Sequence, residues 1–127
     1  MEKVFLDANI LIDLLERKKD KLRLALANHP VFVSPLSIHI ICYAYKYTMP
    51  QKELLEKTKD LFTLVPFDEQ IAIESIQGPT SDFEDNVQLH SAAEVDCDFF
   101  LTRDAKLLAL TFFGKTHIVD TLTQREN

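Results

Sequence analysis

The stretch Val4–Leu15 (VFLDANILIDLL) contains the pattern from which the rest of the fold can be worked out. Val4–Leu6 is a short apolar run of the kind that forms a buried strand, and it ends directly at Asp7. Leucines and isoleucines then recur at helical spacing over residues 10–15, with Asn9 as a candidate N-cap. The stretch therefore predicts a buried strand, an acidic residue at its carboxyl end and an amphipathic helix.

Four further apolar runs of strand length follow, and segments of helical pattern separate them. The runs lie at residues 31–33, 64–67, 98–102 and 117–119, and the helical segments at residues 34–47, 51–61, 69–76, 82–95 and 106–111. Strands that alternate with helices predict an α/β fold, a three-layer sandwich around a central parallel sheet of about five strands. The length of 127 residues predicts a single domain over residues 1–127.

Composition excludes several classes of protein. The chain has only two glycines, Gly78 and Gly114, so it has no Gly-rich loop that could cradle a nucleotide phosphate. No apolar run approaches the length of about 20 residues that a membrane span needs, and residues 1–3 do not open a signal peptide. Cys42 and Cys97 lack metal-site spacing and a disulfide-rich context, so we expect reduced thiols and a cytoplasmic protein.

The negative charge of the chain is concentrated in one segment. A net charge of −6 by itself argues against a protein that binds nucleic acid over its whole surface. Residues 66–104, however, carry ten acidic side chains and one basic side chain, Arg103, whereas residues 1–65 and 105–127 are slightly basic. Most charges in such a segment lie on solvated helix faces. The function therefore depends on whether some of the carboxylates converge.

Aspartates come at the carboxyl ends of four predicted strands: Asp7, Asp68, Asp104 and Asp120. In open parallel sheets ligands bind at this edge, near the switch point in strand order, although Asp also favours turns and helix caps for local reasons. Asp85 lies in the first turn of the helix before the fourth strand, on the face that should pack on the sheet. We expect its carboxylate to point toward the same edge.

Carboxylates held close together predict a particular chemistry. They repel one another, and a divalent cation or proton uptake relieves the repulsion. Oxygen ligands without His or Cys at ligand spacing favour Mg²⁺ or Mn²⁺ over zinc, and such an ion can activate water next to a phosphoryl group. We therefore expect metal-dependent chemistry on a phosphate ester. A phosphotransfer domain is disfavoured, because residues 7–9 (DAN) lack the second Asp of a DxD pair and no lysine follows the fifth strand.

Three motifs carry a family resemblance: Val4–Leu15 (VFLDANILIDLL), Asp82–Gln88 (DFEDNVQ) and Leu101–Asp104 (LTRD). In this order and spacing they resemble the PIN-domain nucleases, and among them the VapC-like toxins of type II toxin–antitoxin pairs. The resemblance covers nearly the whole chain and implies a strand order of 3-2-1-4-5. It also implies a Mg²⁺- or Mn²⁺-dependent endoribonuclease with an RNA substrate and a small antitoxin protein as partner. Members of the family are commonly homodimers.

The resemblance assigns roles to five residues. Asp7, Asp85 and Asp104 match the catalytic, metal-binding carboxylates of the family. Asn9 matches the polar neighbour of the first carboxylate, and Thr102 matches the family's hydroxyl position on the fourth strand.

One family position departs from the pattern. The family usually has a Glu on the second helix, three residues after a Ser or Thr, and Ile40 occupies that place here. Either Asp82 or Glu84 supplies the missing carboxylate, or the metal site is weaker, or activity has been lost. Asp82 is the preferred substitute because it can share a helix face with Asp85. The alternative function is a weakened or inactive PIN-like protein that acts through RNA or protein binding.

Overall fold

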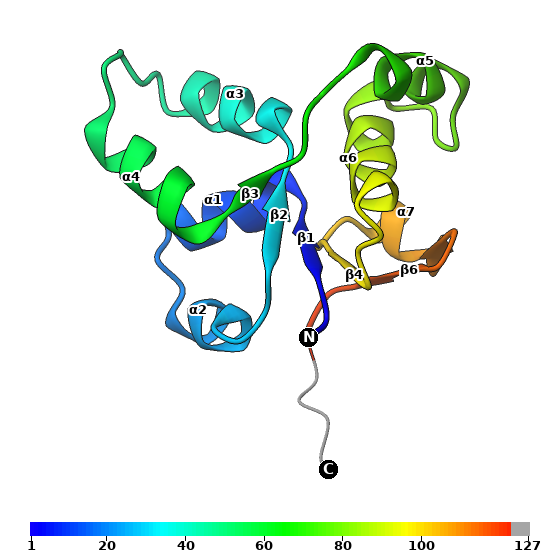
Figure 1. Cartoon of the computed structure of the whole chain (residues 1–127), viewed down its shortest axis with the longest axis horizontal. Helices are drawn as coiled ribbons and strands as arrows, with labels where there is room; N and C mark the ends of the chain where they lie inside the picture. The colour runs from blue at the N-terminus through cyan, green and yellow to red at the C-terminus, as the bar shows by residue number, and fades with distance from the viewer. Residues whose placement is uncertain (123–127) are drawn as a thin grey trace.

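The computed structural model describes residues 1–122 and contains a six-stranded mixed sheet in the order β3-β2-β1-β4-β6-β5 (Figure 1). The strands are β1 (Val4–Leu6), β2 (Val31–Val33), β3 (Thr63–Leu64), β4 (Phe99–Leu101), β5 (Phe112–Phe113) and β6 (Thr116–Val119). Neighbouring strands run parallel from β3 to β6, and β5 pairs antiparallel with β6.

Helices cover both faces of this sheet. They are α1 (Ala8–Leu15), α2 (Asp20–Leu26), α3 (Pro35–Ala44), α4 (Lys52–Leu61), α5 (Glu69–Gln77), α6 (Phe83–Glu94) and α7 (Ala105–Leu108). Figure 1 shows α1 to α4 on one side of the sheet and α5 to α7 on the other. The fold is therefore a three-layer sandwich.

Strand β1 contributes to the cores on both sides of the sheet, because successive side chains of a strand point to opposite faces. Val4 and Leu6 belong to the core with α1 and α2, whereas Phe5 belongs to the core with α5, α6 and α7. The Phe5 ring stacks on Phe100 of β4, with ring centroids 5.5 Å apart. Burial on both faces explains why this strand is a continuous apolar run.

Strands β1 and β4 lie side by side at the centre of the sheet, and Leu6 pairs with Leu101. The Asp7 N–H donates to the Leu101 carbonyl at 3.0 Å, and the Thr102 N–H donates to the Val119 carbonyl of β6 at 2.9 Å. Asp7 and Thr102 therefore leave the sheet next to each other, at its carboxyl edge.

The sandwich predicted from the sequence is confirmed, including the parallel strand order 3-2-1-4. The predicted fifth strand corresponds to β6, and the antiparallel strand β5 beyond it was not predicted. Its hairpin with β6 includes Gly114, whose φ of 60° is a left-handed conformation that glycine adopts without steric cost. Helix α7 ends at Leu108, earlier than the predicted 106–111 segment, and α2 was also not predicted.

Two further local predictions were wrong. Asp7, and not Asn9, is the N-cap of α1, because the Asp7 carboxylate accepts the first helical N–H. The helix predicted over residues 34–47 ends at Ala44. Within residues 1–122, no helix has both the length and the apolar character to cross a membrane.

Candidate active site

Asp7 lies at the carboxyl end of β1 with its side chain almost completely buried. It is 6% exposed, and both of its carboxylate oxygens accept hydrogen bonds. Oδ1 accepts the Ala8 N–H at 2.8 Å, and Oδ2 accepts the Thr102 hydroxyl at 2.7 Å. A buried carboxylate is costly unless it is hydrogen bonded, so these two bonds stabilise the charge and fix the orientation of the carboxylate.

The Thr102 hydroxyl connects two of the candidate carboxylates. It donates to Asp7 and accepts the backbone N–H of Asp104 at 3.0 Å. Asp104 in turn is the N-cap of α7, and its Oδ1 accepts the N–H groups of Lys106 and Leu107 at 2.8 and 3.4 Å. One buried hydroxyl therefore positions the acidic residues that follow two neighbouring strands.

Two more carboxylates come from the start of α6. Asp82 is the N-cap of this helix, and its Oδ1 accepts the backbone N–H of Asp85 at 2.9 Å. The Asp85 carboxylate is half-buried, and no donor in residues 1–122 forms a hydrogen bond with it. It is thus available to a ligand.

The shifts in pKa indicate that these carboxylates lie near enough to repel one another. Burial raises the pKa of Asp7, the bond from Thr102 opposes the rise, and the charges of Asp104 and Asp82 add to it. Burial likewise raises the pKa of Asp85 to about 6, and repulsion from Asp82, Asp7 and Asp104 adds to that rise. Like charges that lie close together raise each other's pKa in this way.

The electrostatic effect on the site distinguishes the two candidates for a fourth carboxylate, Asp82 and Glu84. Asp82 raises the pKa of both Asp7 and Asp85, whereas Glu84 is the weakest contributor to Asp85 alone. Asp82 therefore fits the role of a fourth carboxylate better than Glu84 does. Asn9 lies exposed in the first turn of α1, two residues after Asp7.

Helix α3 contributes a hydroxyl near this edge of the sheet. Ile40 is half-buried on it, one turn after the buried Ser37. The Ser37 Oγ accepts a hydrogen bond from Gln88 Nε2 at 2.9 Å, and Gln88 lies one turn after Asp85 on α6. This bond could not be predicted from local sequence patterns, because its partners are 51 residues apart. Gln88 Oε1 is buried without a hydrogen-bond partner among the described residues.

The donor set suits a hard divalent cation. In residues 1–122 no three His, Cys, Asp or Glu side chains are arranged closely enough to bind one metal ion as they stand. The candidate ligands are nevertheless all carboxylate oxygens, they repel one another, and the Asp85 carboxylate has no partner in the described chain. Oxygen donors of this kind favour Mg²⁺ or Mn²⁺. The residues therefore fit such an ion.

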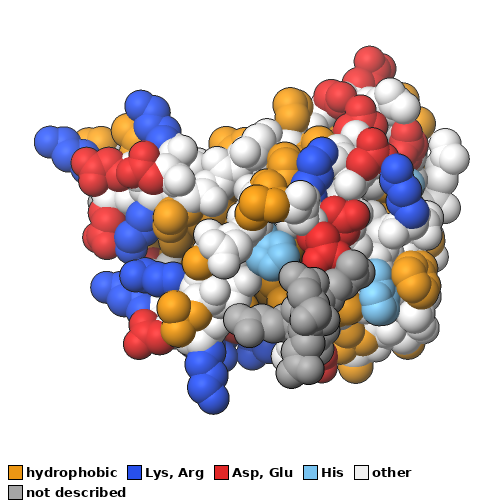
Figure 2. Space-filling model, turned by 60° about the horizontal axis from the view of Figure 1, so that its bottom comes forward, with side chains coloured by type: hydrophobic (Ala, Val, Ile, Leu, Met, Phe, Trp, Pro, Cys, Tyr) orange, Lys and Arg blue, Asp and Glu red, His pale blue; other side chains and the backbone are white. Residues whose placement is uncertain are grey.

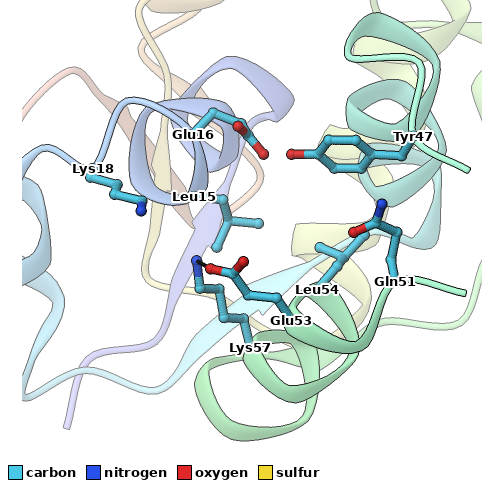
Figure 3. A pocket seen from close by; sticks show the side chains of 8 residues that line it. All are labelled: Leu15, Glu16, Lys18, Tyr47, Gln51, Glu53, Leu54 and Lys57. Carbon is cyan, nitrogen blue, oxygen red and sulfur yellow. Dashed lines mark ion pairs between the residues drawn. The ribbon is translucent and has the colours of Figure 1, made fainter.

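A cavity of about 200 Å³ lies elsewhere, between the carboxyl end of α1 and α4 (Figure 3). Glu16, Lys18, Tyr47 and Glu53 are among the residues that line it, and Figure 3 shows Glu16 and Tyr47 pointing toward each other. None of the candidate carboxylates lines this cavity, so it is separate from the candidate active site.

The comparisons with known proteins agree with this fold. The family model of the PIN domain matches residues 4–112. VapBC2 from Rickettsia felis, solved bound to a DNA fragment from the promoter, aligns with a TM-score of 0.63 and 12% identity over 91% of this chain and 96% of that chain. FitAcB from Neisseria gonorrhoeae aligns with a TM-score of 0.58 and 19% identity over 80% and 87% of the two chains.

A FitAB structure bound to an IR36 DNA fragment aligns with a TM-score of 0.60 and 15% identity, covering 91% of this chain and 93% of that chain. At these identities the likeness to the solved structures shows the fold. The chain has no significant sequence match to a curated protein.

Proposed function

Since this chain belongs to the PIN domain family, whose members are generally nucleases, we propose that it is a metal-dependent endoribonuclease that hydrolyses RNA phosphodiesters. The observation that carries the proposal is the Thr102 hydroxyl, which holds Asp7 and Asp104 at neighbouring strand ends. Asp85 completes the acidic group and has a carboxylate that no donor of the described chain engages. The proposed catalytic residues are Asp7, Asp85 and Asp104.

Mg²⁺ or Mn²⁺ would be held by Asp7, Asp85 and Asp104, with Asp82 as the auxiliary carboxylate. When bound, such an ion lowers the pKa of a water molecule and stabilises negative charge on a phosphoryl oxygen. The role of the chain is to present the ligands in a fixed arrangement. Both Asp7 oxygens are already fixed by hydrogen bonds, and the backbone of Asp104 is fixed by Thr102. Such preorganisation means that little reorganisation is needed when the reaction occurs.

RNA cleavage by the purified protein tests this proposal. We expect hydrolysis of single-stranded RNA in the presence of Mn²⁺ or Mg²⁺, loss of hydrolysis with a chelator, and loss with Asp7→Asn, which keeps the shape of the side chain. Asp60→Asn on the exposed surface of α4 is the matched control and should retain full activity. Cleavage that survives Asp7→Asn would come from a contaminating nuclease and would remove the proposed mechanism.

Ile40 favours a second candidate, a PIN protein with weakened or lost activity that acts through RNA or protein binding. An apolar side chain occupies the place where the family usually has a glutamate, so the site has one carboxylate fewer. Ile40→Glu tests this reading by titration with Mn²⁺. A gain in metal affinity would place residue 40 at the metal site, whereas an unchanged affinity would show that this part of α3 does not reach the site.

We also propose that the chain is the toxin of a toxin–antitoxin pair, acting in the cytoplasm. The similar structures are toxin–antitoxin complexes, which supports an antitoxin partner. Expression of the chain alone should arrest growth, and co-expression of a small protein encoded beside it should restore growth and yield a stable complex. Unimpaired growth with the active wild-type protein would contradict the toxin assignment.

A further inference from the structure

Asp13 on α1 is a buried carboxylate surrounded by three cationic side chains. Its side chain is 3% exposed, and it contacts Arg17, Lys19 and Arg103. Arg17 Nη1 lies 2.7 Å from Oδ1, and Lys19 Nζ lies 3.5 Å from Oδ2. Arg103 forms a bidentate pair, with Nε 3.1 Å from Oδ2 and Nη2 3.3 Å from Oδ1. We call Arg17, Lys19 and Arg103 the basic cluster.

Local backbone structure brings two members of the basic cluster back over Asp13. Helix α1 ends at Leu15, and Lys18 has a φ of 48°, a left-handed conformation that reverses the chain. The Lys19 N–H then donates to the Asp13 carbonyl at 3.2 Å, so Arg17 and Lys19 both reach the same carboxylate. A non-glycine residue in this conformation is uncommon and requires support from its surroundings.

The third member, Arg103, connects the basic cluster to the candidate active site. It lies between Thr102, which bonds Asp7, and Asp104. It is also the only basic residue of the acidic segment 66–104. Because the guanidinium reaches Asp13 on α1, Arg103 joins the basic cluster to the chain segment that carries Asp104, a proposed metal ligand.

Among the described residues, Asp13 is the only carboxylate that forms an ion pair with the three cations, so one negative charge stands against three positive charges. The Arg17, Lys19 and Arg103 side chains are 52%, 49% and 45% exposed, so donors that do not contact Asp13 remain open to solvent. Arginine has five N–H donors in a planar arrangement that matches a phosphate group. Like charges gathered at one point repel, and an anionic ligand removes that repulsion.

We propose that the basic cluster binds a backbone phosphate of the RNA strand, beside the phosphodiester held at the carboxylates. This inference rests on the proposed function and adds a binding site to it. Figure 2 shows more Lys and Arg side chains on one side of the molecule and more Asp and Glu side chains on the other, with both signs present on each side. An RNA strand that reaches from the basic cluster to the candidate site has one phosphate on cations of the protein and another at the carboxylates. The contact is independent of base sequence, because phosphates carry no sequence information.

RNA binding without cleavage tests the proposal. The Asp7→Asn protein, which lacks one repelling carboxylate, is titrated into a fluorescein-labelled single-stranded RNA of about 12 nucleotides with a chelator present, over a series of salt concentrations. The double substitution Arg17→Ala with Lys19→Ala removes two members of the basic cluster and leaves Arg103 paired with Asp13. Lys52→Ala with Lys59→Ala on the exposed surface of α4 changes the net charge equally and is the matched control. Thermal unfolding shows that each variant is folded.

We expect the double substitution in the basic cluster to raise the Kd for the RNA about 3- to 10-fold at low salt. The slope of log K against log salt should fall by about 0.7, the value for one lost phosphate contact on a single strand. The control pair should leave the slope unchanged. The exchange Arg17→Lys with Lys19→Arg keeps both charges and should retain the slope of the parent.

Three outcomes would overturn the inference, each in a different way. An unchanged slope in the basic-cluster variant would place the RNA elsewhere and leave the proposed function intact. Failure of the parent protein to bind RNA at any salt concentration would instead refute the proposed function, and the inference with it. An unchanged RNA slope together with lost binding of a fluorescein-labelled polyglutamate peptide would make the basic cluster a contact for an acidic protein partner.

Discussion

Replacement of Asp85 by asparagine should make the metal-free protein more stable at neutral pH. The pKa of Asp85 is about 6 in the folded chain, against 3.8 for an unperturbed aspartate, because of burial and the neighbouring carboxylates. The folded state therefore binds this proton more tightly than the unfolded chain does. Wild-type stability is lost as the pH rises from about 4 to about 6, and the loss is complete above about 6. Asparagine has the same shape and no charge, so it avoids this loss.

The size of the effect follows from the pKa shift. The difference between 3.8 and about 6 corresponds to about 3 kcal/mol if water screened nothing. Asp85 is only half-buried, so solvent screening reduces the expected gain to about 1 kcal/mol. In a chain of 127 residues that gain raises the Tm by about 4 °C. At about pH 4 the difference should largely disappear, because the folded wild type is then protonated.

Thermal unfolding of the two proteins with a chelator, at about pH 4 and about pH 7.5, measures this difference. Asp60→Asn on α4 is the control and should change stability by less than about 0.5 kcal/mol at both values. Two results would refute the reasoning. One is an Asp85→Asn protein that is less stable than the wild type at the higher pH, and the other is a gain in stability that is the same at both pH values. Mn²⁺ in place of the chelator should then stabilise the wild type by about 3 kcal/mol at a hundredfold excess over its Kd, and the variant by less.

Three further substitutions test other contacts, each by urea unfolding. Thr102→Val removes the hydroxyl that donates to Asp7 and should lower the free energy of unfolding by about 2–3 kcal/mol. Thr102→Ser keeps the hydroxyl and should lower it less. Equal losses in the two variants would contradict the assigned hydrogen bond. Asn86→Leu removes an amide that forms four hydrogen bonds, one to Ser75 of α5 and three to Thr80 in the loop between α5 and α6. The substitution should cost about 3 kcal/mol, and a loss near zero would show that these bonds are not formed. Asp13→Asn should lower the free energy of unfolding by about 2 kcal/mol. A double-mutant cycle with Arg103→Gln should give a coupling free energy of about 1 kcal/mol. Absence of coupling would mean that the Asp13–Arg103 ion pair does not form.

The candidate site could be predicted from the sequence to the extent that it depends on strand ends. Asp7 and Asp104 follow apolar runs, and the carboxyl ends of parallel strands meet at one edge of a sheet, so their proximity follows once the strands are neighbours. The prediction that Asp85 lies near the same edge came from the face of its helix that should pack on the sheet, and the charges of Asp7 and Asp104 do raise its pKa. The hydrogen bonds that fix these carboxylates could not be predicted, since Thr102 and Asp7 are 95 residues apart.

The sequence by itself determined the alternation of buried strands and helices, and with it the class of fold. These are local properties, because the spacing of apolar residues and the position of a cap depend on neighbours within a few residues. Helix α3 shows how far local patterns predict a helix. It begins at Ser34 and Pro35 as predicted. Its end at Ala44 could not be predicted, because the apolar run continues beyond that residue.

The tertiary structure alone decided which polar groups meet. Thr102 with Asp7, Gln88 with Ser37, and Arg103 with Asp13 all join segments more than 50 residues apart in sequence. No local pattern encodes such a pair, because it depends on strand register and on the side chains that fill the space between two elements. The distribution of charge also depends on the tertiary structure. The sequence locates the acidic segment, but only the packing shows that the Arg103 guanidinium pairs with Asp13 and that the carboxylates of the candidate site repel one another.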